Sequence, residues 1–189
     1  STVRGNIVFS ATDTAAYYAQ AIDGSLVATD GSITLQGATY VNGVIEPAPG
    51  TPATASDRGV WINGSAQQLS ATGDITILGK STGGSGIYAL GAYDIVIRST
   101  QGDIIINGIS GPVGNTGTIS TAYGTRLDGA AVTALVGDIS ITGTSLGGGS
   151  GLYLGQPITA LDSVLSPTSG GSITLNGNTI EGALQYYGI

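Results

Sequence analysis

Residues 73–79, with the sequence GDITILG, contain the pattern that decides the fold of this chain. In an extended strand, side chains two positions apart face the same way, so Ile75 and Ile77 share one face and Thr76 points to the other. The same order of glycine, polar residue, aliphatic residue, any residue and apolar residue recurs at GNIVFSA from Gly5, GSITLQG from Gly31, GDIIING from Gly102, GDISITG from Gly137 and GSITLNG from Gly171. A sequence with one signature at every return is typical of a repeat architecture.

Two further short apolar runs follow each signature. The clearest unit is 73–101, in which ITIL is followed by the turn GKSTGGSG, then IYAL, the corner GAY and DIVIRS. Three strands of about four or five residues joined by glycine-rich corners form one triangular coil. The sequence therefore predicts an all-β fold without helices, a right-handed parallel β-helix (β-solenoid) of about five triangular coils. It forms a single segment over 1–189, with coils starting near residues 5, 31, 73, 102, 137 and 171.

Stacking the signature strands about 4.8 Å apart would align their inward side chains into two continuous aliphatic rows. The predicted inward pairs are Ile7/Phe9, Ile33/Leu35, Ile75/Ile77, Ile104/Ile106, Ile139/Ile141 and Ile173/Leu175. An antiparallel sandwich is the alternative, but it would show hairpin signals between neighbouring strands and would not need the same signature at each return.

Glycine precedes five of the signature strands, at Gly31, Gly73, Gly102, Gly137 and Gly171. We expect these glycines at corners, where the backbone adopts a positive φ or approaches another segment closely. The last coil is incomplete, and open coil ends are prone to edge-to-edge association. We therefore expect the natural molecule to continue in both directions, or its copies to stack end to end.

The coils differ in length mainly between the first and second strands, with insertion loops at 37–58 and 108–124. Stacking would place both loops on the same edge of the solenoid. Variable loops on a rigid scaffold often carry binding sites, although these two could equally be insertions that the fold tolerates.

The second strands predict a ladder of outward side chains on successive coils. Aligning the glycines of these strands puts four residues in one register, with Tyr17 or Tyr18 as an extension: Trp61, Tyr88, Arg126 and Tyr153. An exposed aromatic stripe with one arginine could contact sugar rings or a partner protein. The alternative is structural, because rings on neighbouring strands can stabilise a sheet by packing on one another.

Three other patterns in the sequence are candidate sites. A row of outward residues, Thr34, Thr76, Ile105, Ser140 and Thr174, resembles one face of an ice-binding solenoid, but the adjacent row is mixed. Asp74, Asp103 and Asp138 share a register and could hold calcium, although aspartate after glycine is ordinary turn chemistry. Asn63 begins an N-glycosylation sequon, Asn-Gly-Ser. None of these leads us to predict a metal or a cofactor.

The composition excludes several classes of function. The net charge is −7 with only five scattered basic residues, which cannot neutralise a nucleic-acid backbone. Apolar residues make up 41% and charged residues 9%, which argues against disorder, and no run is long and apolar enough for a transmembrane helix. The chain has no His and no Cys and a single lysine, so triad and thiol chemistry are excluded and we predict no enzymatic activity and no catalytic residue.

The signatures GDITILG, GDISITG and GSITLNG, with the connector TSLGGGSGLYLG, resemble repeats of filamentous haemagglutinin-like adhesins. These are large exoproteins of two-partner secretion systems in Gram-negative bacteria. The resemblance implies a long β-helical fibre at the bacterial cell surface that serves in attachment or biofilm cohesion. The chain has no Asn-Pro pair of the kind found in the secretion domain of that family.

Two functions are therefore expected from the sequence. The first is a non-catalytic, rigid stalk segment of a secreted adhesin, located extracellularly, with contact to a host or matrix glycan or protein. The alternative is a filament subunit that self-assembles end to end. The partners in either case are neighbouring solenoid segments of the same or of identical chains.

Overall fold

The computed structural model of the chain describes residues 1–13, 18–39, 58–63, 68–81, 84–111, 122–146, 149–154 and 171–179. These residues form fourteen β-strands and no helix. All the strand pairs among them are parallel. The prediction of an all-β chain with parallel strands is therefore confirmed for this part of the sequence.

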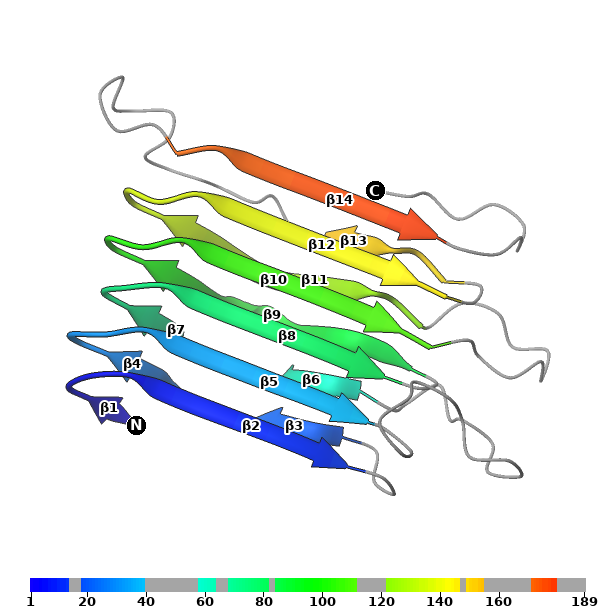
Figure 1. Cartoon of the computed structure of the whole chain (residues 1–189), viewed down its shortest axis with the longest axis horizontal. Helices are drawn as coiled ribbons and strands as arrows, with labels where there is room; N and C mark the ends of the chain where they lie inside the picture. The colour runs from blue at the N-terminus through cyan, green and yellow to red at the C-terminus, as the bar shows by residue number, and fades with distance from the viewer. Residues whose placement is uncertain are drawn as a thin grey trace.

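The six signatures form the six strands of one sheet (Figure 1), each seven residues long. In spatial order they are β14 (Ile173–Thr179), β12 (Ile139–Ser145), β10 (Ile104–Ser110), β8 (Ile75–Ser81), β5 (Ile33–Thr39) and β2 (Ile7–Asp13). Equivalent signature residues are paired without a shift, as in Ile75 with Ile104 and Ile104 with Ile139.

The remaining strands form a second parallel sheet behind the first in Figure 1. They are β1 (Thr2–Val3), β3 (Tyr18–Ile22), β4 (Leu26–Ala28), β6 (Arg58–Asn63), β7 (Gln68–Ala71), β9 (Ser85–Ser99), β11 (Thr125–Ala134) and β13 (Leu152–Leu154). Strands β9 and β11 each span the two apolar runs that follow a signature in the sequence. Accordingly, β6 pairs with the first half of β9 and β7 pairs with its second half. The predicted corner after IYAL therefore lies within one continuous strand.

Aliphatic side chains of both sheets pack into one core. On the four inner strands of the first sheet, the predicted inward pairs are at most 2% exposed; these are Ile33/Leu35, Ile75/Ile77, Ile104/Ile106 and Ile139/Ile141. Val60, Ile62, Ile87 and Leu127 meet them from the second sheet. Branched aliphatic residues fill this interior because their stiff side chains pack well on a pleated surface.

Two residues of the outer strands, Phe9 and Ile173, share the predicted register of the inward rows but are exposed. Phe9 on β2 is 43% exposed and Ile173 on β14 is 42% exposed, whereas Ile7 is buried and Leu175 is half-buried. The reason is the position of these strands, since each has a described neighbour on one side only. Side chains there lack the second row of neighbours that covers their inner equivalents.

The signature strands are also longer than predicted, because they continue through the second glycine of the signature. A Cβ on Gly108 would collide with the carbonyl oxygen of Gly124, the residue before β11, and a Cβ on Gly37 would collide with that of Gly59 on β6. These glycines are therefore points where two backbones meet inside the core.

The predicted loop boundaries change accordingly. Residues 37–39 and 108–110 belong to β5 and β10, and Arg58 is the first residue of β6. The central parts of the predicted insertions, 40–57 and 112–121, lie outside the described residues.

Candidate functional site: an arginine–aromatic cluster

The four predicted ladder residues occupy one register of the second sheet. Trp61 pairs with Tyr88, Tyr88 with Arg126 and Arg126 with Tyr153, which confirms the predicted alignment. The first three side chains are half-buried and Tyr153 is 38% exposed. Their alternation with inward aliphatic neighbours explains the placement, because Val60 and Ile62 on either side of Trp61 fix its side chain on the outer face.

The extension of the ladder to Tyr18 is wrong. Tyr18 pairs with Arg58, and the residue that pairs with Trp61 is Ala21. The predicted position, Tyr18, and the observed one, Ala21, differ by three residues because the first unit has no glycine that fixes the alignment. Tyr17, the other candidate, lies outside the described residues.

Two guanidinium groups bind the aromatic rings into one cluster. The guanidinium carbon of Arg58 lies 4.9 Å from the ring centroid of Trp61 and 4.1 Å from that of Tyr88. The guanidinium carbon of Arg126 lies 4.9 Å from Tyr88, 5.0 Å from Tyr123 and 4.9 Å from Tyr153. Tyr88 thus contacts both arginines, and cation–π interactions join four successive strands of the sheet.

Asp128 completes the cluster on the strand of Arg126. Its Oδ2 accepts a hydrogen bond of 2.6 Å from an Nη of Arg126, and both side chains are less than a third exposed. Burial lowers the pKa of Arg126, but the bond to Asp128 and the nearby Tyr88 and Tyr123 outweigh burial and raise it. The guanidinium therefore stays charged, and the cation–π contacts persist over the whole physiological pH range.

Sequence reasoning found the ladder but missed Arg58, Tyr123 and Asp128. A signal for the first two does exist, since Arg58 stands three residues before Trp61 and Tyr123 three residues before Arg126. Arg58 was assigned to an insertion loop, and its ring contacts depend on the close alignment of strands far apart in the chain. We define the Arg–aromatic cluster as Arg58, Trp61, Tyr88, Tyr123, Arg126, Asp128 and Tyr153.

A second row of side chains follows the first glycine of each signature. Each of the first five members accepts a hydrogen bond from the backbone N–H of the next member, through a hydroxyl, amide or carboxylate oxygen. The five bonds measure 2.6–3.0 Å and link Asn6, Ser32, Asp74, Asp103, Asp138 and Ser172 in that order. We call these six residues the acceptor row.

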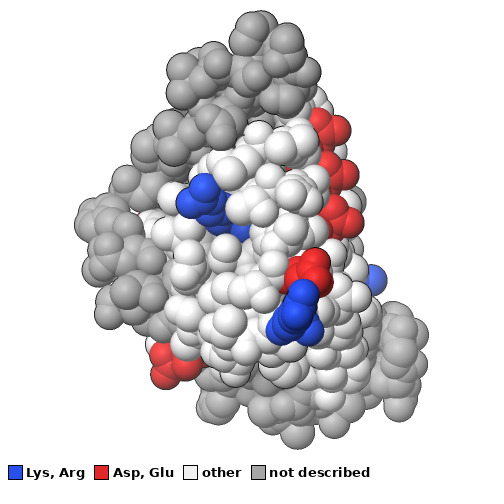
Figure 2. All heavy atoms as spheres, turned by 90° about the vertical axis from the view of Figure 1, so that its left-hand side faces the viewer, with Lys and Arg blue, Asp and Glu red and all other residues white. Residues whose placement is uncertain are grey.

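The acceptor row gives a structural reason for the three aligned aspartates. Asp74 Oδ1 accepts from Asp103 N, and Asp103 Oδ1 accepts from Asp138 N, so one oxygen of each carboxylate satisfies the backbone where the chain enters a strand. Figure 2 shows acidic side chains in a column on this face. In the described part of the chain, no group of three or more His, Cys, Asp or Glu is arranged to hold a metal ion.

The glycines before the acceptor row stack closely on one another. A Cβ on Gly137 or Gly171 would collide with the carbonyl oxygen of the preceding glycine in the row. Close approach is thus the reason for Gly31, Gly73, Gly102, Gly137 and Gly171, and none of these five has a positive φ. Positive φ occurs at Gly5, with φ of 114°, and at Gly24 and Gly129.

A buried hydroxyl row was not foreseen from the sequence. Ser81, Ser110 and Ser145 end three neighbouring signature strands and are fully buried. Ser110 Oγ donates to Ser145 Oγ at 3.2 Å, and the Gly84 N–H donates to Ser81 Oγ at 2.9 Å. These hydroxyl groups satisfy backbone groups at the turn into the second sheet.

The other candidate positions show no assembled site among the described residues. The outward row of Thr34, Thr76, Ile105, Ser140 and Thr174 is in register but interrupted by the exposed Ile105. Asn63 is half-buried at the end of β6, and the rest of its sequon is not described. No helix in the described residues is long and apolar enough to cross a membrane.

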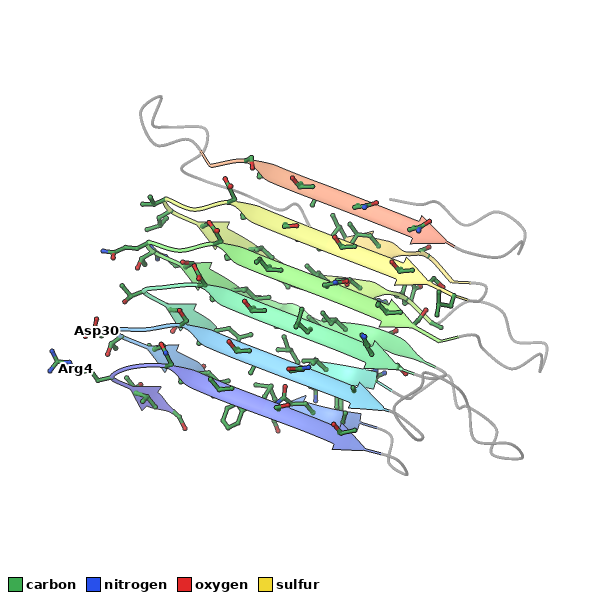
Figure 3. The ribbon with its side chains drawn as sticks, viewed as in Figure 1. Arg4 and Asp30 are labelled. Carbon is green, nitrogen blue, oxygen red and sulfur yellow. The ribbon has the colours of Figure 1, made fainter. Side chains whose placement is uncertain are left out.

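Charged pairs elsewhere are peripheral. Arg4 and Asp30 lie on the connections that lead into β2 and β5, and they point into solvent (Figure 3). Their side chains are 88% and 70% exposed, with Nε and Oδ2 3.7 Å apart. An ion pair this exposed contributes little to stability because water screens it.

Comparisons of the chain with protein-family models, with curated proteins and with solved structures found no match.

Proposed function

We propose that this chain is a right-handed parallel β-solenoid of about five triangular coils and acts as a non-catalytic stalk segment of a secreted bacterial surface adhesin or fibre. One observation carries the proposal: six strands from six sequence units pair in parallel, residue for residue, in a single sheet. A chain that returns to the same register at every unit advances by about 4.8 Å per unit.

Three features of the described residues favour a load-bearing rather than a catalytic role. The interior is filled with aliphatic side chains on both sheets. The acceptor row and the buried hydroxyl row add hydrogen bonds between successive strands. The acidic groups in register are engaged by backbone N–H groups, and no basic side chain shares their row. General acid–base catalysis needs an open site with paired groups, for which this arrangement gives no support.

Deleting one whole unit tests the proposal. Removing residues 73–101 joins Thr72 to Gly102, so that the strand from Ile104 would follow β5 and Arg126 would lie beside Trp61. A solenoid should keep its β-sheet circular dichroism and unfold cooperatively, with a smaller denaturant m-value because less surface is buried. Deleting residues 73–86, about half a unit, is the control and should abolish folding. If the whole-unit deletion also fails to fold, the solenoid proposal is wrong.

The implied setting is the outside of a bacterial cell, with neighbouring solenoid segments as partners. Antibodies against the chain should label intact cells of the organism that makes it as strongly as lysed cells. Labelling confined to lysed cells would contradict the proposed location.

The Arg–aromatic cluster is the part of the chain proposed to contact a host or matrix glycan or protein. Trp61 and Tyr88 are half-buried and Tyr153 is exposed, and the guanidinium of Arg126 contacts the rings of Tyr88 and Tyr153. The double variant Trp61→Ala with Tyr88→Ala should lower binding on a glycan array and leave the thermal stability of the protein little changed. Unchanged binding together with a large loss of stability would assign the cluster to structure alone.

A second candidate function is that of a filament subunit whose copies stack end to end. The observation that favours it is the exposure of Phe9 and Ile173, which belong to the aliphatic rows but lie on the outer strands. Purified protein that forms filaments in the electron microscope supports this candidate, whereas a monodisperse monomer supports the stalk segment.

A further inference from the structure

We infer that copies of this chain associate head to tail, with the outer edge of β14 in one copy paired in parallel with the outer edge of β2 in the next, so that Ile173 lies beside Ile7. This inference rests on the proposed solenoid and specifies the partner and the register of its filament-forming candidate. Four steps support it.

The two edges are complementary in direction. Among the described strands, β2 pairs only with β5 and β14 pairs only with β12, so each has one edge whose N–H and C=O groups lack a strand partner. The two strands run in the same direction at opposite ends of one sheet (Figure 1). Moving one copy along the stacking direction therefore brings the free edge of β14 to the free edge of β2 without any rotation of the sheet.

The inner strands show what covers such an edge. Each inner signature strand has a signature strand on both sides, and its inward residues, such as Ile33 and Leu35, are fully buried. In the proposed register, Ile173 and Leu175 of one copy lie beside Ile7 and Phe9 of the next. They take the positions that Ile33 and Leu35 occupy on the other side of β2 within one chain. The exposed Phe9 and Ile173 would thus gain the neighbours that they lack.

The acceptor row continues across the same junction. Ser172 donates its N–H to Asp138 Oδ1, and among the described residues it is the last member of the row. The next member in the stacked arrangement is Asn6 of the following copy. A serine can fill this role, because Ser32 Oγ accepts from the N–H of Asp74 at 3.0 Å. The register that covers the exposed aliphatic side chains therefore also extends the hydrogen bonds of the acceptor row.

The competing arrangement is less favourable on the same grounds. Two β2 edges could pair head to head, but only in an antiparallel manner. The acceptor row would then be interrupted, since Asn6 of each copy would lie at opposite ends of the paired strands. The head-to-tail arrangement preserves both the parallel pairing of the signature strands and the hydrogen bonds of the acceptor row.

Cysteine cross-linking can test the register, because the chain contains no cysteine. In the proposed register, Asn176 lies beside Ser10, and both residues are exposed. Parallel neighbours are about 4.8 Å apart, within the Cα–Cα range of a disulfide. Mild oxidation of the variant Ser10→Cys with Asn176→Cys should yield disulfide-linked dimers, trimers and longer species on a non-reducing gel. Ring closure within one molecule is excluded, since the two strands lie at opposite ends of the sheet.

A matched control comes from β10. Asn107 occupies the same register as Asn176 and is also exposed, but β10 has β8 on one side and β12 on the other. Ser10→Cys with Asn107→Cys should therefore give no multimers under the same oxidation. The single variant Ser10→Cys separates the two arrangements: dimers from this variant alone would indicate head-to-head pairing and overturn the inference.

A charge at the junction should weaken the association. Adding Ile173→Asp to the double-cysteine variant places a carboxylate in the aliphatic row, and we expect the multimer fraction to fall roughly tenfold or more. Because Ile173 is exposed in the single chain, the circular dichroism spectrum should not change. Absence of multimers from the folded double-cysteine variant would refute head-to-tail association and leave the stalk proposal standing, which the unit deletion tests separately.

Discussion

The acceptor row and the Arg–aromatic cluster stabilise the same kind of stacking by different means. The acceptor row repeats one bond between successive signature strands, and asparagine, serine and aspartate oxygens all serve as the acceptor. The cluster is irregular: arginine, tryptophan and tyrosine alternate, and each guanidinium group contacts two or three rings. The difference shows that equivalent positions on successive strands can be stabilised in two ways. In the acceptor row, each position needs one oxygen that accepts from one N–H, whereas in the cluster an arginine can contact several different rings.

The two regions should therefore respond differently to substitution. In the acceptor row, the requirement is an oxygen at a fixed distance from one N–H, so any short acceptor suffices. In the cluster, the interaction depends on the planar guanidinium, which a lysine cannot reproduce. Four predictions sharpen this contrast, and the first concerns the core to which both regions are attached.

We expect Gly108→Val to be the most destructive substitution, with a loss of more than about 4 kcal/mol in the free energy of unfolding or no folding at all. The added Cβ would collide with the backbone of Gly124, which cannot move without separating the two sheets. Both regions should lose order together. Asn107→Val, at the exposed neighbouring position, is the control and should cost little. Equal stability of the two variants in urea would contradict the close packing of the sheets.

Removing the central arginine of the cluster should have the next largest effect. We expect Arg126→Ala to lower the free energy of unfolding by about 2–3 kcal/mol, because three ring contacts and the bond to Asp128 are lost. Arg126→Lys should recover less than half of this loss. The exposed Arg98 provides the control, since Arg98→Ala should be nearly neutral. Full recovery by lysine would show that charge, rather than stacking, holds the cluster.

For the acceptor row, we expect Asp103→Ala to cost about 1–2 kcal/mol, because the Asp138 N–H loses its acceptor. Asp103→Asn should restore most of the stability, as the asparagine at position 6 already serves in this role. The asparagine variant also removes one of three stacked charges, so it should reduce the dependence of stability on salt. A loss in Asp103→Asn as large as in Asp103→Ala would show that the row needs the carboxylate charge.

The exposed ion pair gives the smallest expected effect. Arg4→Ala or Asp30→Ala should change the free energy of unfolding by less than about 0.5 kcal/mol, since both side chains are largely in water. A double-mutant cycle of the two positions should give a coupling energy close to zero. A coupling above about 1 kcal/mol would mean that this part of the surface is more rigid than its exposure suggests.

Much of the fold could be read from the chain because one signature contains both the strand and its inward residues. The alternation at Ile75 and Ile77 predicted burial correctly, and the glycine alignment placed Trp61, Tyr88, Arg126 and Tyr153 in one register. Phe9 and Ile173 match the pattern equally well, yet they are exposed, since burial depends on neighbours that a local pattern does not contain.

The cluster shows the same limit at the candidate site. Its register was predictable from spacing, but the contacts of Arg58 and Tyr123 with the ladder were not. The contacts of Arg58 with Tyr88 and of Tyr123 with Tyr153 each join residues 30 positions apart in the sequence, and they depend on how far each side chain reaches across neighbouring strands.

The alternation within each signature and its return along the chain are enough to predict parallel strands, the positions of the signature strands and the face that turns inward, because the order of residues alone contains both patterns. Three features follow instead from the folded structure: the backbone contacts at Gly37, Gly79, Gly108 and Gly143, the role of three aspartates as hydrogen-bond acceptors, and the ring contacts of two arginines. Each of these features is a contact between different strands or their connections, so its geometry exists only once the sheets have formed.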